Sequence, residues 1–155
     1  MGLPQIIANA HRSQLRAHGV DVVYRSATAG DVEVRALHKQ SFAKMVEESG
    51  AYLTTVADDW HIAAASLVDD DGREITPRAG DAVFLVESSG LVTQFDVLAW
   101  ADEPARAFAD VTRQIHNVHS KQVRQFVAGQ LLSESGAPLL FESGAPLISE
   151  SVVTV

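Results

Sequence analysis

Residues 81–98 read DAVFLVESSGLVTQFDVL, and this stretch gives the clearest indication of the fold. An apolar run ends at Glu87, a Ser-Ser-Gly turn follows, and a second run of β-forming residues begins at Leu91. Two such runs joined by a short glycine-containing turn are typical of a β-hairpin. Pro77 and Gly80 break the chain just before the first run. The stretch therefore predicts an antiparallel hairpin within a mainly β protein.

The preceding part of the chain carries further strand patterns. Residues 20–35 alternate apolar and polar side chains on both sides of a glycine-containing turn, which predicts another hairpin. Residues 51–57 are rich in β-forming residues and predict a strand, with Asp58 and Asp59 forming the turn after it. Residues 40–50 fit neither the helical nor the strand period cleanly, and a strand is preferred there.

The N-terminal residues 3–18 predict a helix, because their apolar side chains fall near one face at helical spacing. Pro4 suits a first helical turn. We expect Gly19 to end the helix in a left-handed conformation. The residues that define the apolar face are Leu3, Ile6, Ile7, Ala10 and Leu15.

The C-terminal part contains an identical repeat, ESGAPL, at residues 134–139 and again at 142–147. A short hairpin of this kind is only marginally stable alone in water. Its apolar side chains are therefore expected either to fold back on their own domain or to add strands to a neighbouring subunit. The expected contact residues are Leu139, Phe141, Leu147 and Ile148. The chain then divides into an N-terminal helix (1–19), a β domain (20–127) and a C-terminal repeat arm (128–155).

Residues 105–127 support two interpretations. Phe108, Val111, Ile115 and Val118 are spaced three, four and three residues apart, which favours a helix. The segment 111–118 also has the composition of a strand that closes a barrel. Periodicity alone prefers the helix.

Composition excludes several classes of function. The chain has no cysteine, so disulfides, thiolate metal sites and cysteine nucleophiles are excluded. Its 12 basic and 20 acidic side chains give a net charge of −8, which makes it a poor general binder of nucleic acid. An acidic surface either serves solubility or lines a channel along which DNA slides without sticking.

Catalytic motifs are absent from the sequence. It contains no dinucleotide-binding loop, P-loop or Gly-x-Ser-x-Gly nucleophile elbow. His116 and His119 would share a face on a helix and could begin a metal site with Asp110, but on a strand they would point to opposite faces. A small metal- or ligand-binding enzyme using these histidines is the alternative; the expectation is no enzyme, no cofactor and no metal.

One basic cluster occurs in this acidic chain, and it is either a solvated face or a docking patch for an acidic partner. Trp60 either fills the core or contacts a partner. The cluster comprises Arg113, His116, His119, Lys121 and Arg124.

Four segments, taken in order, carry a resemblance to a known family. They are DWHIAAASL at 59–67, ITPRAGD at 75–81, Val97 with Trp100, and TRQIHNVHSK at 112–121. In this order they resemble the head–tail joining proteins of tailed bacteriophages and prophages. Those proteins share an aromatic-x-Ile with a Leu-ended turn, Pro-x-x-Gly-Asp before a strand, and a closing Arg-x-x-Ile-His-x-Lys-like segment. The resemblance covers residues 20–125, so the helix and the arm are interpreted as additions.

The resemblance implies a structural virion protein with a small antiparallel β-barrel that assembles as a ring in the neck. Such a ring closes the head and docks the tail; a tail terminator or other tail component is the alternative within this class. The implied partners are sister copies, the portal or an adaptor protein, and the tail tube or tail terminator. DNA would pass through the channel without sequence-specific binding. Assembly is expected in the host cytoplasm and no membrane contact is expected, since no apolar run approaches about 18 residues.

Overall fold

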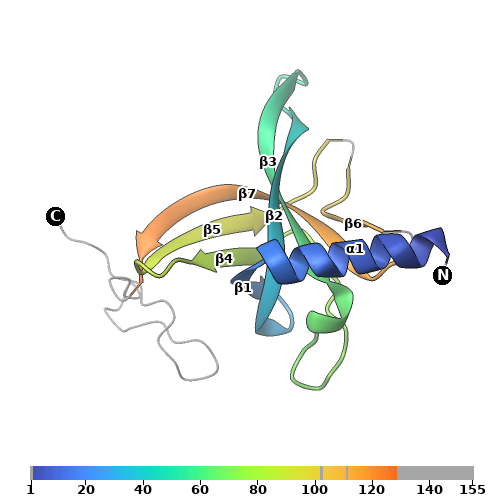
Figure 1. The fold of residues 1–155 in the computed structure, drawn as a ribbon. Coiled ribbons are helices and arrows are strands. Elements are labelled where there is room, and N and C mark those ends of the chain that lie inside the picture. Colours follow the sequence, from blue (N-terminus) through green and yellow to red (C-terminus); the bar gives the residue numbers. More distant parts are fainter. Residues whose placement is uncertain (1, 102, 111, 129–155) are drawn as a thin grey trace.

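A computed structural model describes residues 2–101, 103–110 and 112–128 (Figure 1). Residues 129–155 of the predicted repeat arm, with its four expected contact residues, lie outside the described residues. One long helix precedes the strands, and a single 3₁₀ turn, η1 (Ala64–Ser66), follows the third strand. The elements are α1 (Leu3–His18), β1 (Val20–Ser26), β2 (Gly30–Val46), β3 (Tyr52–Ala63), β4 (Ala82–Val86), β5 (Leu91–Val97), β6 (Arg106–Phe108) and β7 (Ile115–Val127).

The strands form one antiparallel seven-stranded sheet in the order β3-β2-β1-β4-β5-β7-β6. β7 also pairs with β3, from Asp58 opposite Ser120 to Ala63 opposite Ile115. The pairings therefore lead from β3 through β2, β1, β4, β5 and β7 back to β3. The predicted mainly β fold with an N-terminal helix is confirmed.

The core lies between the facing sides of these strands. Trp60 is fully buried at its centre, with its ring edge-on to Phe95 at a centroid distance of 5.0 Å. Tyr24, Ile62 and Val118 are also fully buried in the same cluster. The described residues include no helix with the length and apolar character that a membrane span requires.

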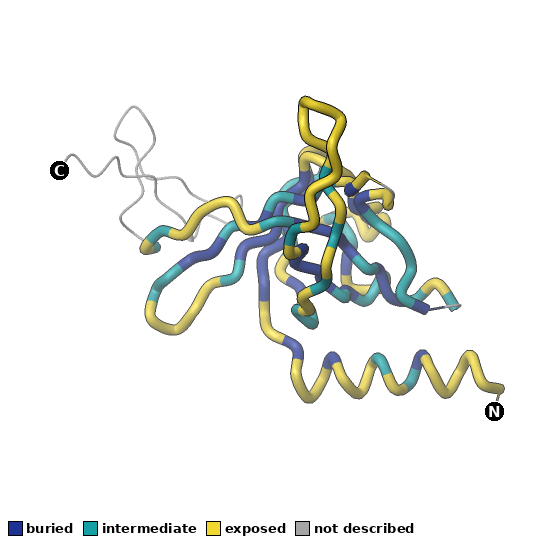
Figure 2. The backbone as a smooth tube through the Cα atoms, turned by 90° about the horizontal axis from the view of Figure 1, so that it is seen from above, coloured by how far each residue is buried: buried dark blue, intermediate teal, exposed yellow. Residues whose placement is uncertain are grey.

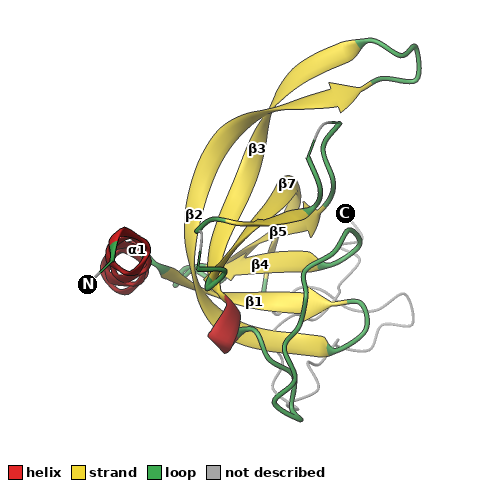
Figure 3. Ribbon diagram, turned by 90° about the vertical axis from the view of Figure 1, so that its right-hand side faces the viewer, coloured by secondary structure: helices red, strands yellow, loops and turns green. Residues whose placement is uncertain are grey.

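The β2–β3 hairpin extends beyond the rest of the sheet (Figure 3). Its register is continuous from Ala36 opposite Ile62 to Val46 opposite Tyr52, without a bulge. Residues 40–46 are therefore part of a strand, which confirms the preference for a strand in this ambiguous segment. The predicted hairpins at 20–35 and 81–98 are confirmed as well.

Of the two interpretations of residues 105–127, the helix that periodicity alone prefers is wrong and the strand is confirmed, because β6 and β7 occupy this segment. Ile115, His116, Val118 and His119 are all buried, since β7 is covered on both faces near its beginning. Burial on both faces removes the period of two by which a strand is recognised. The apolar spacing of three and four residues is then compatible with a strand.

Asp58 and Asp59 do not form a turn, which is a second correction. Both lie within β3, and both are only 7% exposed. Buried carboxylates are stable only where hydrogen bonds or opposite charges compensate for the lost hydration. The compensating groups come from β2 and β7, which are distant in sequence and carry no local signal.

Gly19 is extended, with φ −67° and ψ 151°, so the predicted left-handed conformation is wrong. The glycine is required for a different reason. A Cβ at this position would lie 2.3 Å from the Leu15 carbonyl oxygen, which accepts the Gly19 N–H. The residue therefore allows a close approach of the chain to the last helical turn, where β1 begins.

The Asp81 side chain shows what the Pro-x-x-Gly-Asp segment does in the fold. Its carboxylate accepts hydrogen bonds from the Tyr24 hydroxyl at 2.5 Å, the Ala27 N–H at 2.9 Å and the Arg78 N–H at 3.1 Å. Gly80 supplies the positive φ of 96° that the preceding turn needs. The segment thus ties the start of β4 to the β1–β2 turn.

Replacement of Asp81 by asparagine is expected to lower the free energy of unfolding by about 1–3 kcal/mol, because the amide NH₂ would face buried donors. Asp71→Asn, at an exposed side chain, is the matched control and should change it by less than about 0.5 kcal/mol. Urea denaturation followed by tryptophan fluorescence measures both. Equal midpoints for the two variants would contradict the assigned role of Asp81.

Candidate functional site

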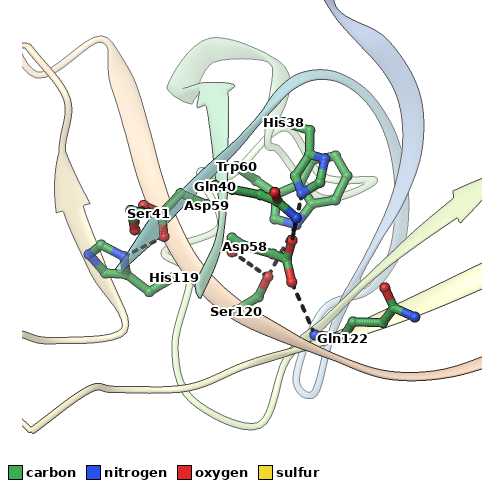
Figure 4. Close-up of polar contacts among 9 residues, drawn as sticks. All are labelled: His38, Gln40, Ser41, Asp58, Asp59, Trp60, His119, Ser120 and Gln122. Carbon is green, nitrogen blue, oxygen red and sulfur yellow. Dashed lines mark hydrogen bonds and ion pairs between the residues drawn. The ribbon is translucent and has the colours of Figure 1, made fainter. Parts of the chain in front are cut away.

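The adjacent carboxylates of Asp58 and Asp59 organise two polar networks on opposite sides of β3 (Figure 4). Alternation along the strand sends neighbouring side chains to opposite faces. Asp58 lies on the side of Trp60, which faces the core. Asp59 lies on the other side, beside His119 of β7.

The Asp58 network joins three strands at the edge of the core. The His38 Nε2 lies 2.9 Å from Asp58 Oδ1, and the imidazole stacks on the Trp60 ring at 4.5 Å. Ser120 donates its hydroxyl to the Asp58 carbonyl at 2.6 Å and accepts the Trp60 indole N–H at 3.1 Å. The Gln122 N–H donates to the second carboxylate oxygen at 3.4 Å. These bonds fix β2 and β7 to β3.

The Asp59 network places an imidazole between two carboxylates. The His119 Nδ1 lies 2.8 Å from Asp59 Oδ1, and its Nε2 lies 3.2 Å from Glu103 Oε2. The Ser41 hydroxyl donates to Asp59 at 2.7 Å. The hydrogen bond with Asp59 raises the pKa of His119, and this outweighs the opposing effect of burial. Burial alone would raise the pKa of Asp59, but hydrogen bonds from His119 and Ser41 hold it below its usual range.

This arrangement is suited to holding strands together and not to nucleophilic catalysis. In a hydrolytic triad the serine hydroxyl bonds to the imidazole, which in turn bonds to the carboxylate. Here Ser41 and His119 both bond to the same carboxylate, that of Asp59. The Ser41 hydroxyl therefore has no hydrogen bond to the imidazole that would activate it as a nucleophile, and the contacts are those of a structural ion pair.

Stability is expected to reach a maximum near pH 6.5. Burial lowers the pKa of His61 to about 4 and also lowers the pKa of His116. Below about pH 6.5 these two histidines are therefore protonated in the unfolded chain but stay neutral in the folded protein. Stability therefore falls as the pH drops below this value. Above it the folded His119 retains a proton that the unfolded chain has lost, so stability also falls as the pH rises through the raised pKa of His119.

Urea midpoints at pH 5, 6.5 and 8.5 measure this dependence. The variant His119→Gln should lose the decline between pH 6.5 and 8.5 while keeping the one below pH 6.5. A wild-type midpoint that increases from pH 6.5 to 8.5 would contradict the assignment.

The structure separates the residues of the predicted basic cluster. His116 and His119 are buried, and Arg113 is exposed in the turn before β7, with a positive φ of 55°. Lys121 and Arg124 line one shallow hollow beside β5. The five residues thus do not form one exposed patch, and the docking role of the exposed cations stays a prediction. Trp60, fully buried, is a core residue.

The alternative of a metal site has no support in this geometry. His116 stacks on Phe108 and lies 3.4 Å from Glu74, whereas His119 contacts other acids on the opposite face of β7. Asp110 instead accepts the N–H groups of Gln114 and Ile115 and so closes the turn before the strand. Across residues 2–101, 103–110 and 112–128, no group of three histidine, aspartate or glutamate side chains is arranged so that it could hold a metal ion.

Two exposed apolar surfaces were not predicted from the sequence. One, here called the hairpin face, lies on the projecting β2–β3 ribbon and consists of Phe42, Val46, Tyr52 and Val56. The other, the helix face, lies on the N-terminal half of α1, where the chain is exposed along most of its length (Figure 2). It consists of Leu3, Ile6 and Ile7, of which Leu3 is 69% exposed.

A model of the phage head–tail joining protein family matches residues 1–126 of the chain. The match includes α1, so the interpretation of the helix as an addition to the family pattern is wrong. It ends just before the predicted repeat arm. No curated protein matches the chain.

Proposed function

The chain belongs to the phage head–tail joining protein family, and from this premise we propose that it forms a ring in the virion neck between the portal and the tail. Membership makes it a structural component of the virion. In our proposal the ring closes the DNA-filled head and provides the surface on which the tail docks. The protein performs no catalysis.

The circuit of strand pairings from β3 back to β3 is the observation that carries the proposal. It supports a β-barrel as the body of each subunit, because a closed sheet has no free edges along the strands of the circuit. Contacts between copies then depend mainly on the segments that project from the body. Both the hairpin and α1 project in this way (Figure 1).

Charge supports the passage of DNA through such a ring. The net charge of −8 disfavours binding to phosphates, so DNA that moves past the subunits is weakly repelled and is not bound. The proposed protein partners are the portal or an adaptor protein on one side and the tail tube or tail terminator on the other. Assembly takes place in the host cytoplasm.

A phage whose copy of this gene is inactivated tests the proposal. Lysates should contain filled heads and finished tails that stay separate, and adding the purified full-length protein should join them into infectious particles. Electron microscopy of the protein bound to the heads should reveal a ring at the portal vertex. Heads and tails that join without the protein would refute the proposal. Binding to isolated tails but not to heads would favour a tail terminator.

A further inference from the structure

The hairpin face is an apolar surface without cover from the described residues. The register places Phe42 opposite Val56 and Val46 opposite Tyr52, so all four side chains lie on one side of the ribbon, with the exposed pair Lys44 and Thr54 between them. Phe42 is 83% exposed and Tyr52 is 66% exposed. A two-stranded ribbon is marginally stable in water unless one side packs against another element. The odd-numbered side of β2 contacts the body through Ser41 and Met45. The hairpin face is thus the side of the ribbon that is left for a partner surface.

The helix face is a second such surface. α1 contacts its own sheet through Ala8 and Leu15, which are buried. At 100° per residue, Leu3 and Ile6 lie on a different side of the helix from these two contacts, and Ile7 lies between. Leu3 and Ile6 are 69% and 51% exposed. The prediction of a single apolar face that includes Leu15 is therefore wrong: Leu15 is buried against the sheet, and Leu3 and Ile6 are exposed on another side.

The two faces cannot meet within one chain, because they lie on opposite sides of β2. Even-numbered residues of β2, such as Ala36, face the core, and the hairpin face continues this side beyond the body. α1 lies on the other side, where Arg35 donates to the Leu15 carbonyl at 3.1 Å and His61 lies near His11. Contact between the two faces therefore requires two molecules.

Charge favours the same pairing. α1 contains Arg12 and Arg16 and no acidic residue, so the rest of the chain has 10 basic residues (12 − 2) and all 20 acidic ones. Glu47 and Glu48 are exposed at the turn of the hairpin, next to the hairpin face. A basic helix is attracted to such a turn, and the attraction fixes the orientation of the contact.

We infer that the helix face of one copy packs on the hairpin face of the next copy. The contact joins two different surfaces, so each copy offers one face to each neighbour. A contact of this kind builds a ring where the rotation between successive copies closes, as the proposed ring requires. This inference rests on the proposed ring and names the surfaces that build it. In this inference, another copy of this chain covers each of the two faces.

Two single variants of the full-length protein test the inference. Phe42→Asp and Ile6→Glu each place a carboxylate in one of the faces, and each should weaken self-association at least about 100-fold. Leu53→Asp, on the other side of the same ribbon, and Gln5→Glu, on another side of the same helix, are the matched controls and should assemble normally. Circular dichroism checks that all four fold.

Mixing the two defective variants gives the sharper result. The Phe42→Asp copy retains its helix face and the Ile6→Glu copy retains its hairpin face, so one contact remains possible. Sedimentation should reveal one-to-one dimers and nothing larger. Two defective variants that stay monomeric after mixing would overturn the inference.

Cysteine cross-linking tests the contact in assembled particles, since the natural chain has no cysteine. Phage carrying the Ile6→Cys, Phe42→Cys double variant should yield a ladder of disulfide-linked multimers on a non-reducing gel. The Ile6→Cys, Leu53→Cys control should yield none. Absence of the ladder in joined particles overturns the inference and leaves the proposed ring intact.

Other occupants would give different results. If Phe42→Asp forms normal rings but does not join heads to tails, the hairpin face binds another virion protein and the inference fails. If Phe42→Asp and Ile6→Glu both assemble and join like the wild type, the inference fails while the proposed function stands. The proposed function fails separately if heads and tails join without the protein.

Discussion

Replacing Trp60 with alanine is expected to lower the free energy of unfolding by about 3–5 kcal/mol, the range typical of large aromatic truncations in a core. The side chain is fully buried, and its ring packs edge-on to Phe95 and flat against His38. Its indole N–H also donates to Ser120, which in turn bonds to the carbonyl of Asp58. Truncation therefore leaves a cavity and removes one member of a buried polar chain.

Urea denaturation followed by circular dichroism measures the loss, with Tyr52→Ala as the control. Tyr52 is a large aromatic residue at an exposed position, so its truncation should change the stability of the monomer by less than about 0.5 kcal/mol. Trp60→Phe keeps a ring and loses the N–H bond, and an intermediate loss is expected. Indistinguishable midpoints for Trp60→Ala and Tyr52→Ala would be incompatible with the core described above.

The elements that could be predicted from the sequence are those whose pattern lies within their own residues. The hairpin at 81–98 carries its own turn, and the α1 helix carries its own apolar spacing. The start of β7 carries neither, because it is buried on both faces by strands from elsewhere in the chain. Its strand conformation depends on pairing with β3 and β5. These strands are distant in the sequence, so a local pattern does not include them.

The burial of two adjacent carboxylates could not be predicted for a related reason. Asp58 and Asp59 have the composition of a turn, and only the arrival of His38 and His119 makes their burial favourable. The alternative of a metal site needed a helix at His116 and His119, and the strand β7 sends the two side chains to opposite faces. The hairpin face could not be predicted, because residues 40–50 do not alternate cleanly: Lys44 lies on the side of Phe42, and Met45 lies on the other side.

Removal of either member of the Asp59–His119 pair is expected to cost about 3–5 kcal/mol, because each leaves an uncompensated charge or polar group in a buried position. Asp59 and His119 are 7% and 5% exposed, and their atoms lie 2.8 Å apart. The double variant Asp59→Ala, His119→Ala removes both groups, so its loss should be smaller than the sum of the two single losses. Urea denaturation at pH 6.5 measures all three.

The exposed pair of Asp21 and Arg35 is the matched control, since its atoms lie 3.1 Å apart and the Asp21 side chain is 84% exposed. Water screens such a pair, and Asp21→Ala should cost about 0–1 kcal/mol. Both pairs join neighbouring strands at similar distances, so the expected difference in stability follows from the burial of one pair and the exposure of the other. Additive losses for Asp59→Ala and His119→Ala would mean that the two side chains act independently. The Asp59 network would then not be the clamp that holds β7 against β3, and closure of the strand circuit would depend on the Asp58 network and the backbone pairing alone.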